Sequence, residues 1–183
     1  MKVVVEREMP ADLIEGFYGL YREAFEPLRT RAAARHVLTA EEFAEEMVDA
    51  RVDKYVVYDR EGRAVALTTF TDDLRTVPWI EPAYYAARFP EQAARNAIFY
   101  LGFTLVHPDQ QGGPAFALTV VQLVHRLVAS GGVCAYDICA YNDTVRSLGA
   151  EIEKAVTAMA DVTIVGSDTQ TYYTAEFHAR ASH

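Results

Sequence analysis

The stretch FTLVHPDQQGGPAFALTVVQLV (residues 103–124) contains the features that decide the fold of this chain. An apolar run ends at His107-Pro108, a polar turn with two glycines follows, and an apolar pattern of helical period begins at once. Such a turn aims free backbone N–H groups at one point, where the helix dipole adds partial positive charge. Glycines let a ligand approach the backbone, and Pro114 removes only a donor that has no intrahelical partner. The pattern therefore predicts a strand, an anion-binding turn and a helix.

The spacing of this turn excludes two well-known phosphate-binding motifs. The turn lacks the Gly-Lys-Ser/Thr ending of a P-loop, and it lacks the GxGxxG spacing of a dinucleotide-binding turn. A Gly-Gly pair before a helix also occurs in plain structural turns. Spacing alone therefore leaves the anion-binding and the structural interpretations open.

Length and composition are those of one globular domain over residues 1–183, with 51% hydrophobic and 23% charged residues. The net charge of -9 argues against nucleic acid as a partner, because nucleic-acid binders carry a basic surface. No apolar run approaches the roughly 20 residues of a membrane span, and the stretch MKVVVEREMP has too short an apolar run for a signal peptide. We therefore expect a cytoplasmic protein with no membrane partner.

The two cysteines give no sign of a disulfide or a metal site. Cys134 and Cys139 fall in a segment that is predicted to be one strand, and their odd spacing sends the two side chains to opposite faces. Neither cysteine has a CxxC or His neighbour pattern, so no zinc site is indicated. We expect two structural cysteines and no bound metal.

The first half of the chain predicts two helices and three strands. Residues 2–8 form a short strand, and residues 11–28 carry an apolar stripe at helical spacing. Thr39 and Glu42 have the spacing of a capping box, so a second helix begins there. The acidic residues of that helix are expected on a solvated face: Glu41, Glu45, Glu46 and Asp49. Residues 54–59 and 64–71 flank a short glycine turn and predict a hairpin.

The second half predicts strand–helix–strand units. Residues 72–96 are irregular and aromatic, and residues 79–89 would line either an acceptor pocket or a satellite core. Residues 97–106 predict a central strand with a bulge at Gly102. The remaining predictions are a helix over 114–128, a strand over 131–141, a helix from Asn142 to about 156, and a β pair in 161–166 and 171–177. The order β-α-α-β-β-β-α-β-α-β-β predicts a mixed α/β fold.

The chain resembles the GCN5-related N-acetyltransferase family in element order and in two stretches, LVHPDQQGGPAFALTVVQLV and YDICAYNDTVRSLGAEIEKAV. In that family the fourth strand leads through a Q/R-x-x-G-x-G/A turn into the third helix, and Gln110 to Ala115 satisfies Q-x-x-G-x-A. Asn142 stands where the family has an Asn that opens the next helix. The resemblance implies a twisted mixed sheet with helices on both faces.

The resemblance also implies a site for acetyl-CoA or another acyl-CoA. The turn amides would hold the pyrophosphate, the strand before the turn would pair with the pantetheine arm, and the thioester would lie in the gap between the strands ending at Val106 and near Tyr141. The implied cofactor-binding residues are Leu105, Val106, His107, Gln110, Gln111, Gly112, Gly113, Ala115 and Asn142. The implied activity is direct N-acyl transfer to an amine of a small molecule or peptide, and family members are often homodimers.

One position departs from the family pattern. The family often presents a Tyr seven residues after the Asn as general acid, and this chain has Gly149 there. A glycine inside a helix costs roughly 1 kcal/mol relative to alanine, so it serves close packing or leaves room for a ligand. The alternative is therefore a catalytically silent domain that binds CoA or another ligand as a sensor or interaction module.

N-acyl transfer needs a proton acceptor for the amine and a donor for the thioester oxygen or the leaving thiolate. Glu81, in the aromatic loop, and Asp137, in an apolar strand where its pKa would rise, are the candidate bases. Tyr141 is the candidate substitute for the acid, with further tyrosines as alternatives: Tyr136, Tyr172 and Tyr173. His107 either orients the turn or acts as a base. A basic segment would favour an acidic acceptor or would be solvated: Arg29, Arg31 and Arg35.

Overall fold

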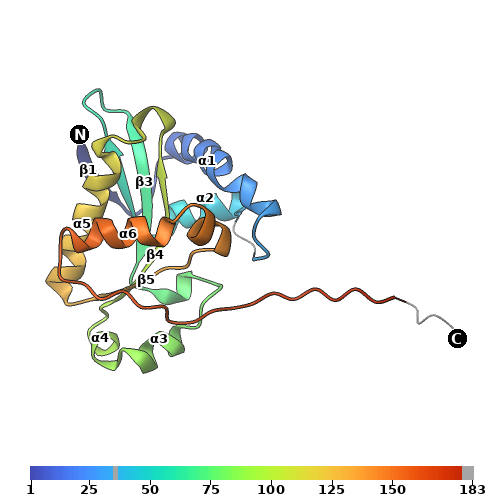
Figure 1. Cartoon of the computed structure of the whole chain (residues 1–183). Coiled ribbons are helices and arrows are strands. Elements are labelled where there is room, and N and C mark those ends of the chain that lie inside the picture. Colours follow the sequence, from blue (N-terminus) through green and yellow to red (C-terminus); the bar gives the residue numbers. More distant parts are fainter. Residues whose placement is uncertain (35–36, 179–183) are drawn as a thin grey trace, which may run out of the picture.

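The computed structural model describes residues 1–34 and 37–178. Its centre is a five-stranded sheet with the order β1-β2-β3-β4-β5 (Figure 1). Neighbouring strands are antiparallel from β1 to β4, whereas β4 and β5 are parallel. The strands are β1 (Lys2–Glu6), β2 (Val52–Tyr58), β3 (Ala64–Thr71), β4 (Ile98–Val106) and β5 (Val133–Ala135). The prediction of a mixed α/β fold is confirmed.

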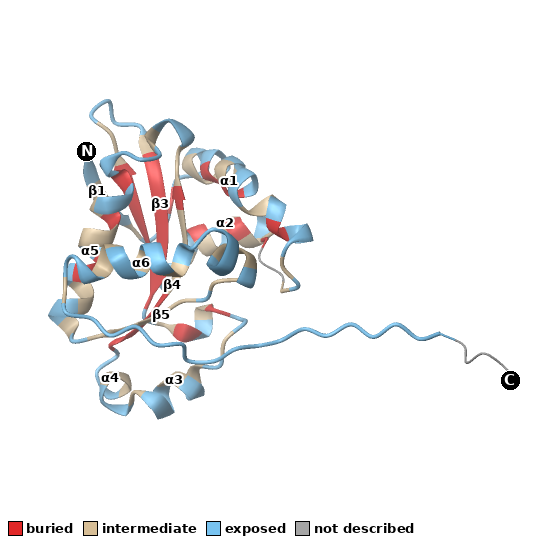
Figure 2. Cartoon of the chain, in the orientation of Figure 1, coloured by how far each residue is buried: buried red, intermediate tan, exposed pale blue. Residues whose placement is uncertain are grey.

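Helices cover both faces of the sheet, as predicted. Helices α1 (Ala11–Phe25) and α2 (Ala40–Val48) pack on one face, and α5 (Pro114–Ser130) packs on the other. Alternation along β2 explains the two layers, because Val56 joins the core under α1 and α2 while Val57 joins the core under α5. Figure 2 shows that burial concentrates in the central strands and on the inward faces of these helices.

Two local signals account for the first half. The capping box at Thr39 is present, with the Glu42 amide donating to Thr39 Oγ1 over 3.2 Å and the Thr39 amide donating to the Glu42 carboxylate over 2.8 Å. The first helix ends at Phe25, earlier than predicted, and continues as the 3-10 helix η1 (Glu26–Thr30). Pro27 explains this change, because a proline ring is incompatible with the preceding turn of an α-helix.

Residues 72–96 are more regular than predicted. They form η2 (Leu74–Thr76), α3 (Pro82–Arg88) and α4 (Pro90–Ala94). Pro82 and Pro90 each stand at the first position of a helix, where a proline is compatible with helix formation. Part of this region is satellite core, with buried Leu74 and Val77 against Tyr100.

A bulge interrupts the pairing of β3 with β4, as predicted at Gly102. Thr68 pairs with Thr104 and Phe70 pairs with Leu101, so two residues of β4 oppose one residue of β3. A Cβ atom at Gly102 would lie 2.3 Å from Oγ1 of Thr69, which explains why glycine is needed. The bulge bends β4 where its pairing with β5 also ends.

The chain after β4 departs most from the prediction. The turn η3 (Pro108–Gln110) precedes α5 as expected, but β5 ends at Ala135 instead of continuing to residue 141. Asn142 lies inside the π-helical turn η4 (Tyr141–Val145) and does not open a long helix. Helix α6 (Leu148–Thr157) begins only after Ser147, whose φ of 54° breaks the helical path.

The predicted β pair in 161–166 and 171–177 is wrong for the described structure. Residues 158–178 form no helix or strand, and all of them except Ala160 are exposed (Figures 1 and 2). No neighbouring strand supplies backbone partners to this segment within the described chain. No helix among residues 1–34 and 37–178 is long and apolar enough to cross a membrane.

Candidate functional site

The turn before α5 exposes backbone donors. The Gln110 and Gly113 amides donate within the turn, to the carbonyls of His107 at 2.8 Å and Gln110 at 3.1 Å, and Gln111 donates more weakly, over 3.4 Å. Within the described chain, the amides of Gly112, Ala115 and Phe116 have no acceptor. Gly112 has a φ of 76°, and Gly113 caps α5 without a side-chain hydrogen bond. The turn therefore offers three free N–H groups at the positive end of a 17-residue helix.

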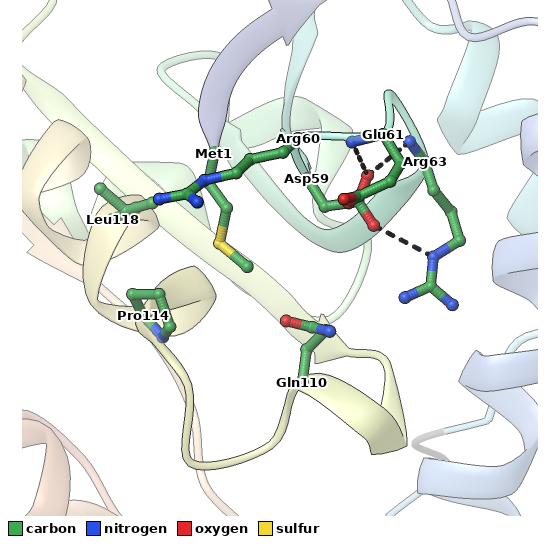
Figure 3. A pocket seen from close by; sticks show the side chains of 8 residues that line it. All are labelled: Met1, Asp59, Arg60, Glu61, Arg63, Gln110, Pro114 and Leu118. Atoms are coloured by element: carbon green, nitrogen blue, oxygen red, sulfur yellow. Dashed lines mark hydrogen bonds and ion pairs between the residues drawn. The ribbon is translucent and has the colours of Figure 1, made fainter.

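A hollow of about 450 Å³ lies beside this turn, bordered by Gln110 and Pro114 (Figure 3). On its other side stand two arginines from the turn between β2 and β3. Arg63 is held by the carboxylates of Asp59 and Asp109, at 3.2 and 2.8 Å. Arg60 has no ion pair within the described chain, so its positive charge is free on the rim of the hollow. The carboxylates of Asp59 and Glu61 line the same hollow and offset the arginine charges, so the turn amides are the groups that favour an anionic ligand.

One edge of β4 has no strand partner beyond the point where its pairing with β5 ends. The two strands pair only from Ile98 with Val133 to Tyr100 with Ala135. From Leu101 to Val106 the described chain offers β4 a strand partner only on the β3 side. Backbone groups on the other edge are therefore available to an extended ligand. β5 ends at Ala135, so β4 and β5 separate there instead of near Tyr141 as predicted.

Glu46 lies at the β4 bulge. Its side chain is half-buried on α2, hydrogen-bonds to Thr69, and has a carboxylate oxygen 3.7 Å from the position of a Cβ at Gly102. Burial raises the pKa of this carboxyl, against the smaller lowering effects of Thr69 and of the Lys54 charge. The prediction that Glu46 belongs to a solvated face is wrong, because it shares the inward face of α2 with Phe43 and Met47.

Lys54 lies beneath the same region and is completely buried. Its ammonium donates to the carbonyls of Arg7 and Asp49, at 2.7 Å each. Burial lowers its pKa to about 8, although the Asp49 and Glu46 charges oppose this shift. The charge of Lys54 lowers the pKa of Glu46 slightly, although the two side chains form no direct ion pair.

A second polar cluster lies where β4 and β5 separate, at Tyr100. The Tyr100 hydroxyl donates to the Asp137 carboxylate in a short hydrogen bond. Trp79 Nε1 donates to the same two groups, at 3.0 and 3.1 Å. Tyr100 is buried, and burial together with Asp137 raises its pKa. Asp137 itself is exposed beyond the end of β5, so the expectation of a carboxylate inside an apolar strand is wrong.

Tyr141, the first residue of η4, contacts the segment that follows η1. Arg31 donates to the Tyr141 hydroxyl over 3.1 Å, and its guanidinium lies 4.8 Å from the ring centroid. Arg29 is paired with Glu26 at 2.9 Å instead. Arg29 and Arg31 of the predicted basic segment therefore have different partners. Arg35 lies outside the described residues.

The nearest group to Gly149 is the carboxylate of Asp143, which would lie 2.5 Å from a Cβ at that position. Asp143 is exposed, so its side chain can move aside, and packing does not require a glycine there. Asn142 is half-buried in the η4 turn.

The structure brings together only part of the predicted site. The cofactor set from Leu105 to Ala115 is continuous along β4, η3 and the start of α5. Glu81 instead caps α3, accepting from the Ala83 amide over 3.1 Å. Tyr172 and Tyr173 are both exposed, so neither faces the gap. His107 pairs with Asp109 over 2.7 Å, which supports its orienting role.

Sequence reasoning missed Glu46, Arg60 and the Trp79–Tyr100 pair. Glu46 follows buried Phe43 by three residues, and that helical spacing is a signal that could have placed it inward. Arg60 gave no signal, because its nearness to the turn depends on how the β2–β3 hairpin is placed. Both cysteines are free, and burial raises the pKa of the Cys134 thiol to about 12. No cluster of three or more potential metal-ligand side chains occurs in residues 1–34 and 37–178.

Comparison with known proteins adds little to this geometry. No family model matches the chain, and no curated protein matches it. A solved structure of a point mutant of the BH1408 protein from Bacillus halodurans is similar at 11% identity, with a TM-score of 0.47. The match covers 93% of this chain and 100% of that chain. A likeness of this degree carries no argument about function.

Proposed function

We propose that this chain is an acyl-CoA-dependent N-acyltransferase built on a GCN5-related N-acetyltransferase scaffold. The observation that carries the proposal is one continuous surface: the open edge of β4 leads into a turn with three free amides at the start of α5. CoA has a matching order of parts, with an amide-bearing pantetheine arm next to a pyrophosphate. The open strand edge suits the amides, and the turn suits the phosphates.

The hollow beside the turn extends this match to the other end of CoA. Its size of about 450 Å³ is within the range of small-ligand sites. The guanidinium of Arg60 would bind the phosphate on the ribose of CoA. Because the turn is exposed, the adenine ring of CoA would stay partly solvated.

The reacting end would lie at the β4 bulge. There the amine nitrogen attacks the thioester carbonyl carbon, a C–N bond forms, and the C–S bond breaks with the electron pair leaving on the CoA sulfur. We assign the proton from the amine to Glu46, because its carboxylate lies at the bulge and burial raises its pKa, which makes it a stronger base than an exposed carboxylate. Glu81 is the weaker candidate for this role, because its carboxylate caps α3. Tyr141 or Tyr100 would donate a proton toward the sulfur.

The second candidate is a catalytically silent CoA-binding domain. The observation that favours it is Gly149, which stands where the family often has a tyrosine acid and has the carboxylate of Asp143 as its nearest group. A carboxylate near the leaving thiolate would disfavour the charge that develops. This alternative predicts CoA binding without transfer to any amine. Turnover of acetyl-CoA with a panel of primary amines separates the two candidates.

The proposal is tested by calorimetric titration with acetyl-CoA. The wild-type chain should bind, and Gly113→Glu should weaken binding at least tenfold, because a carboxylate at the turn repels the pyrophosphate. Gly166→Glu is the matched control, since an added side chain there meets open space. No binding to the wild-type chain at millimolar acetyl-CoA, or equal affinity in the Gly113 and Gly166 variants, would overturn the placement.

A further inference from the structure

Trp79, the one tryptophan of the chain, stands at the surface although its polar atom is already bonded. Its Nε1 donates to the Tyr100 hydroxyl and to the Asp137 carboxylate, yet the residue is 55% exposed. Hydration of the N–H group therefore does not explain the exposure. An indole ring exposed in this way is a surface on which an organic cation binds favourably.

The carboxylate beside this ring is oriented and only half used. Oδ1 of Asp137 accepts the hydrogen bonds from Tyr100 and Trp79, which fix the direction of the carboxylate. In the part of the chain that the structure describes, Oδ2 accepts no hydrogen bond and Asp137 forms no ion pair. Because Asp137 is exposed, its second oxygen is left for a ligand with N–H donors.

The charges around this pair are negative. Asp137 and Asp168 both act on the Tyr85 hydroxyl, and they add to burial, the main cause, in raising its pKa. No cation of the described chain opposes this shift. The surroundings of the exposed ring therefore favour a positively charged group.

The protein contains a filled example of the same arrangement. The guanidinium of Arg126 lies 5.1 Å from the ring centroid of Phe99 and forms an ion pair with the Asp53 carboxylate. An aromatic ring and a carboxylate thus hold an arginine together at that place. Trp79 and Asp137 present the same two kinds of group, but no described arginine or lysine pairs with either of them.

We propose that Trp79 and Asp137 bind the arginine side chain of a ligand. The planar guanidinium would stack on the exposed indole ring and donate N–H groups to Oδ2 of Asp137. A guanidinium suits this site better than an ammonium, because it is flat and weakly hydrated and can stack while it donates hydrogen bonds. Tyr100 is a positioning residue for this site, because its hydroxyl holds the carboxylate. This inference does not rest on the proposed activity.

The test uses Trp79 as its own reporter. Because the chain has one tryptophan, the indole signal in a proton–nitrogen NMR spectrum comes from this residue alone. Nα-acetyl-arginine amide and free arginine, which stand for a peptide and an amino acid ligand, should shift that signal to saturation. Nα-acetyl-citrulline amide, a neutral analogue of similar shape, should shift it little, and Nα-acetyl-lysine amide should bind more weakly. All titrations are made at constant ionic strength without acyl-CoA, so their outcome is independent of acyl transfer.

Asp137→Asn tests the carboxylate. Asparagine keeps an oxygen for Tyr100 and Trp79 but loses the charge, so the dissociation constant for Nα-acetyl-arginine amide should rise about tenfold or more. Asp161→Asn is the matched control, because it removes the same charge from an exposed residue after α6. Equal thermal melting midpoints would show that both variants fold.

Four results would overturn the proposal. The first is the absence of a saturable shift in the wild-type chain. The second is an equal response to the citrulline amide, which would mean that the charge of the ligand is not recognised. The third is tighter binding of the lysine amide than of the arginine amide. The fourth is equal affinity in the Asp137 and Asp161 variants, which would show that the net charge of the protein attracts the ligand.

Discussion

Gly102 and Gly149 meet the same kind of obstacle in two different settings. A Cβ at Gly102 would lie 2.3 Å from Thr69 Oγ1, and a Cβ at Gly149 would lie 2.5 Å from the Asp143 carboxylate. Thr69 is buried in β3 and hydrogen-bonds to the Phe103 amide, so it cannot move aside. Asp143 is an exposed residue in a short turn and can rotate. An added Cβ should therefore cost more folding free energy at Gly102 than at Gly149, although the two distances are similar.

The same contrast separates two larger parts of the molecule. The sheet body, residues 1–106, holds its apolar side chains in continuous clusters between helices and strands. The C-terminal segment, residues 136–178, has no buried residue, and Asp137 joins it to the sheet through a hydrogen bond from Tyr100. We therefore place the precise positioning of reacting groups in the sheet body and expect adjustable contacts in the C-terminal segment.

The largest effect should come from the carboxylate of the sheet body. Glu46→Gln removes the proton acceptor at the bulge, so we expect kcat to fall about 100-fold or more. Acetyl-CoA affinity should stay unchanged, because Glu46 lies away from the turn that holds the phosphates. Glu45→Gln is the matched control, since Glu45 is exposed on the neighbouring position of α2. Steady-state kinetics and calorimetry on both variants measure the two quantities.

The pH profile adds a sign to this prediction. Burial raises the pKa of Glu46, and only the ionised carboxylate accepts a proton, so activity should rise with pH through that raised pKa. The rising limb should vanish in Glu46→Gln and persist in Asp137→Asn, which changes the C-terminal segment. A wild-type profile in Glu46→Gln would show that the base lies elsewhere.

The next largest effect should be on stability. Gly102→Ala forces the β3–β4 bulge apart, and we expect a loss of about 1–3 kcal/mol in the free energy of unfolding. Thr69→Ala in the same chain should return part of that loss, because it removes the obstructing hydroxyl. Urea denaturation of the two single variants and the double variant gives the coupling energy. Additive losses would mean that Thr69 is not the obstacle.

The smallest effect should follow Gly149→Ala. The exposed Asp143 side chain turns away, and alanine regains roughly 1 kcal/mol of helix propensity in α6. The free energy of unfolding should therefore change by less than about 1 kcal/mol. A loss as large as that of Gly102→Ala would erase the contrast between the two regions, and the same urea titration decides it.

Periodicity and capping predicted the first four strands and the first two helices, but not the short helices α3 and α4. The capping box at Thr39, the alternation of β2 and the bulge at Gly102 each depend on neighbours in the sequence, so local patterns contain them. The same patterns misplaced Glu46, because acidic composition outweighed its spacing from Phe43. Burial of a charged side chain depends on what packs over the helix, which no local pattern specifies.

The C-terminal segment could not be predicted in the same way. A stretch such as TYYTAEF favours a strand, but a strand also needs a partner, and the partner is a property of the assembled sheet. The break at Ser147 arises from a left-handed residue that a helical pattern does not exclude. The contacts of Asp137 with Tyr100 and of Tyr141 with Arg31 join segments far apart in the sequence, so no local pattern could predict them.

The central claim is that the open edge of β4 and the turn before α5 together bind acyl-CoA. Hydrogen exchange of the wild-type chain with and without saturating acetyl-CoA tests it directly. We predict slower exchange in two stretches, residues 102–106 and the amides of Gly112, Ala115 and Phe116, with no change along β1. Unchanged exchange in both stretches, or protection confined to another part of the molecule, would contradict the account.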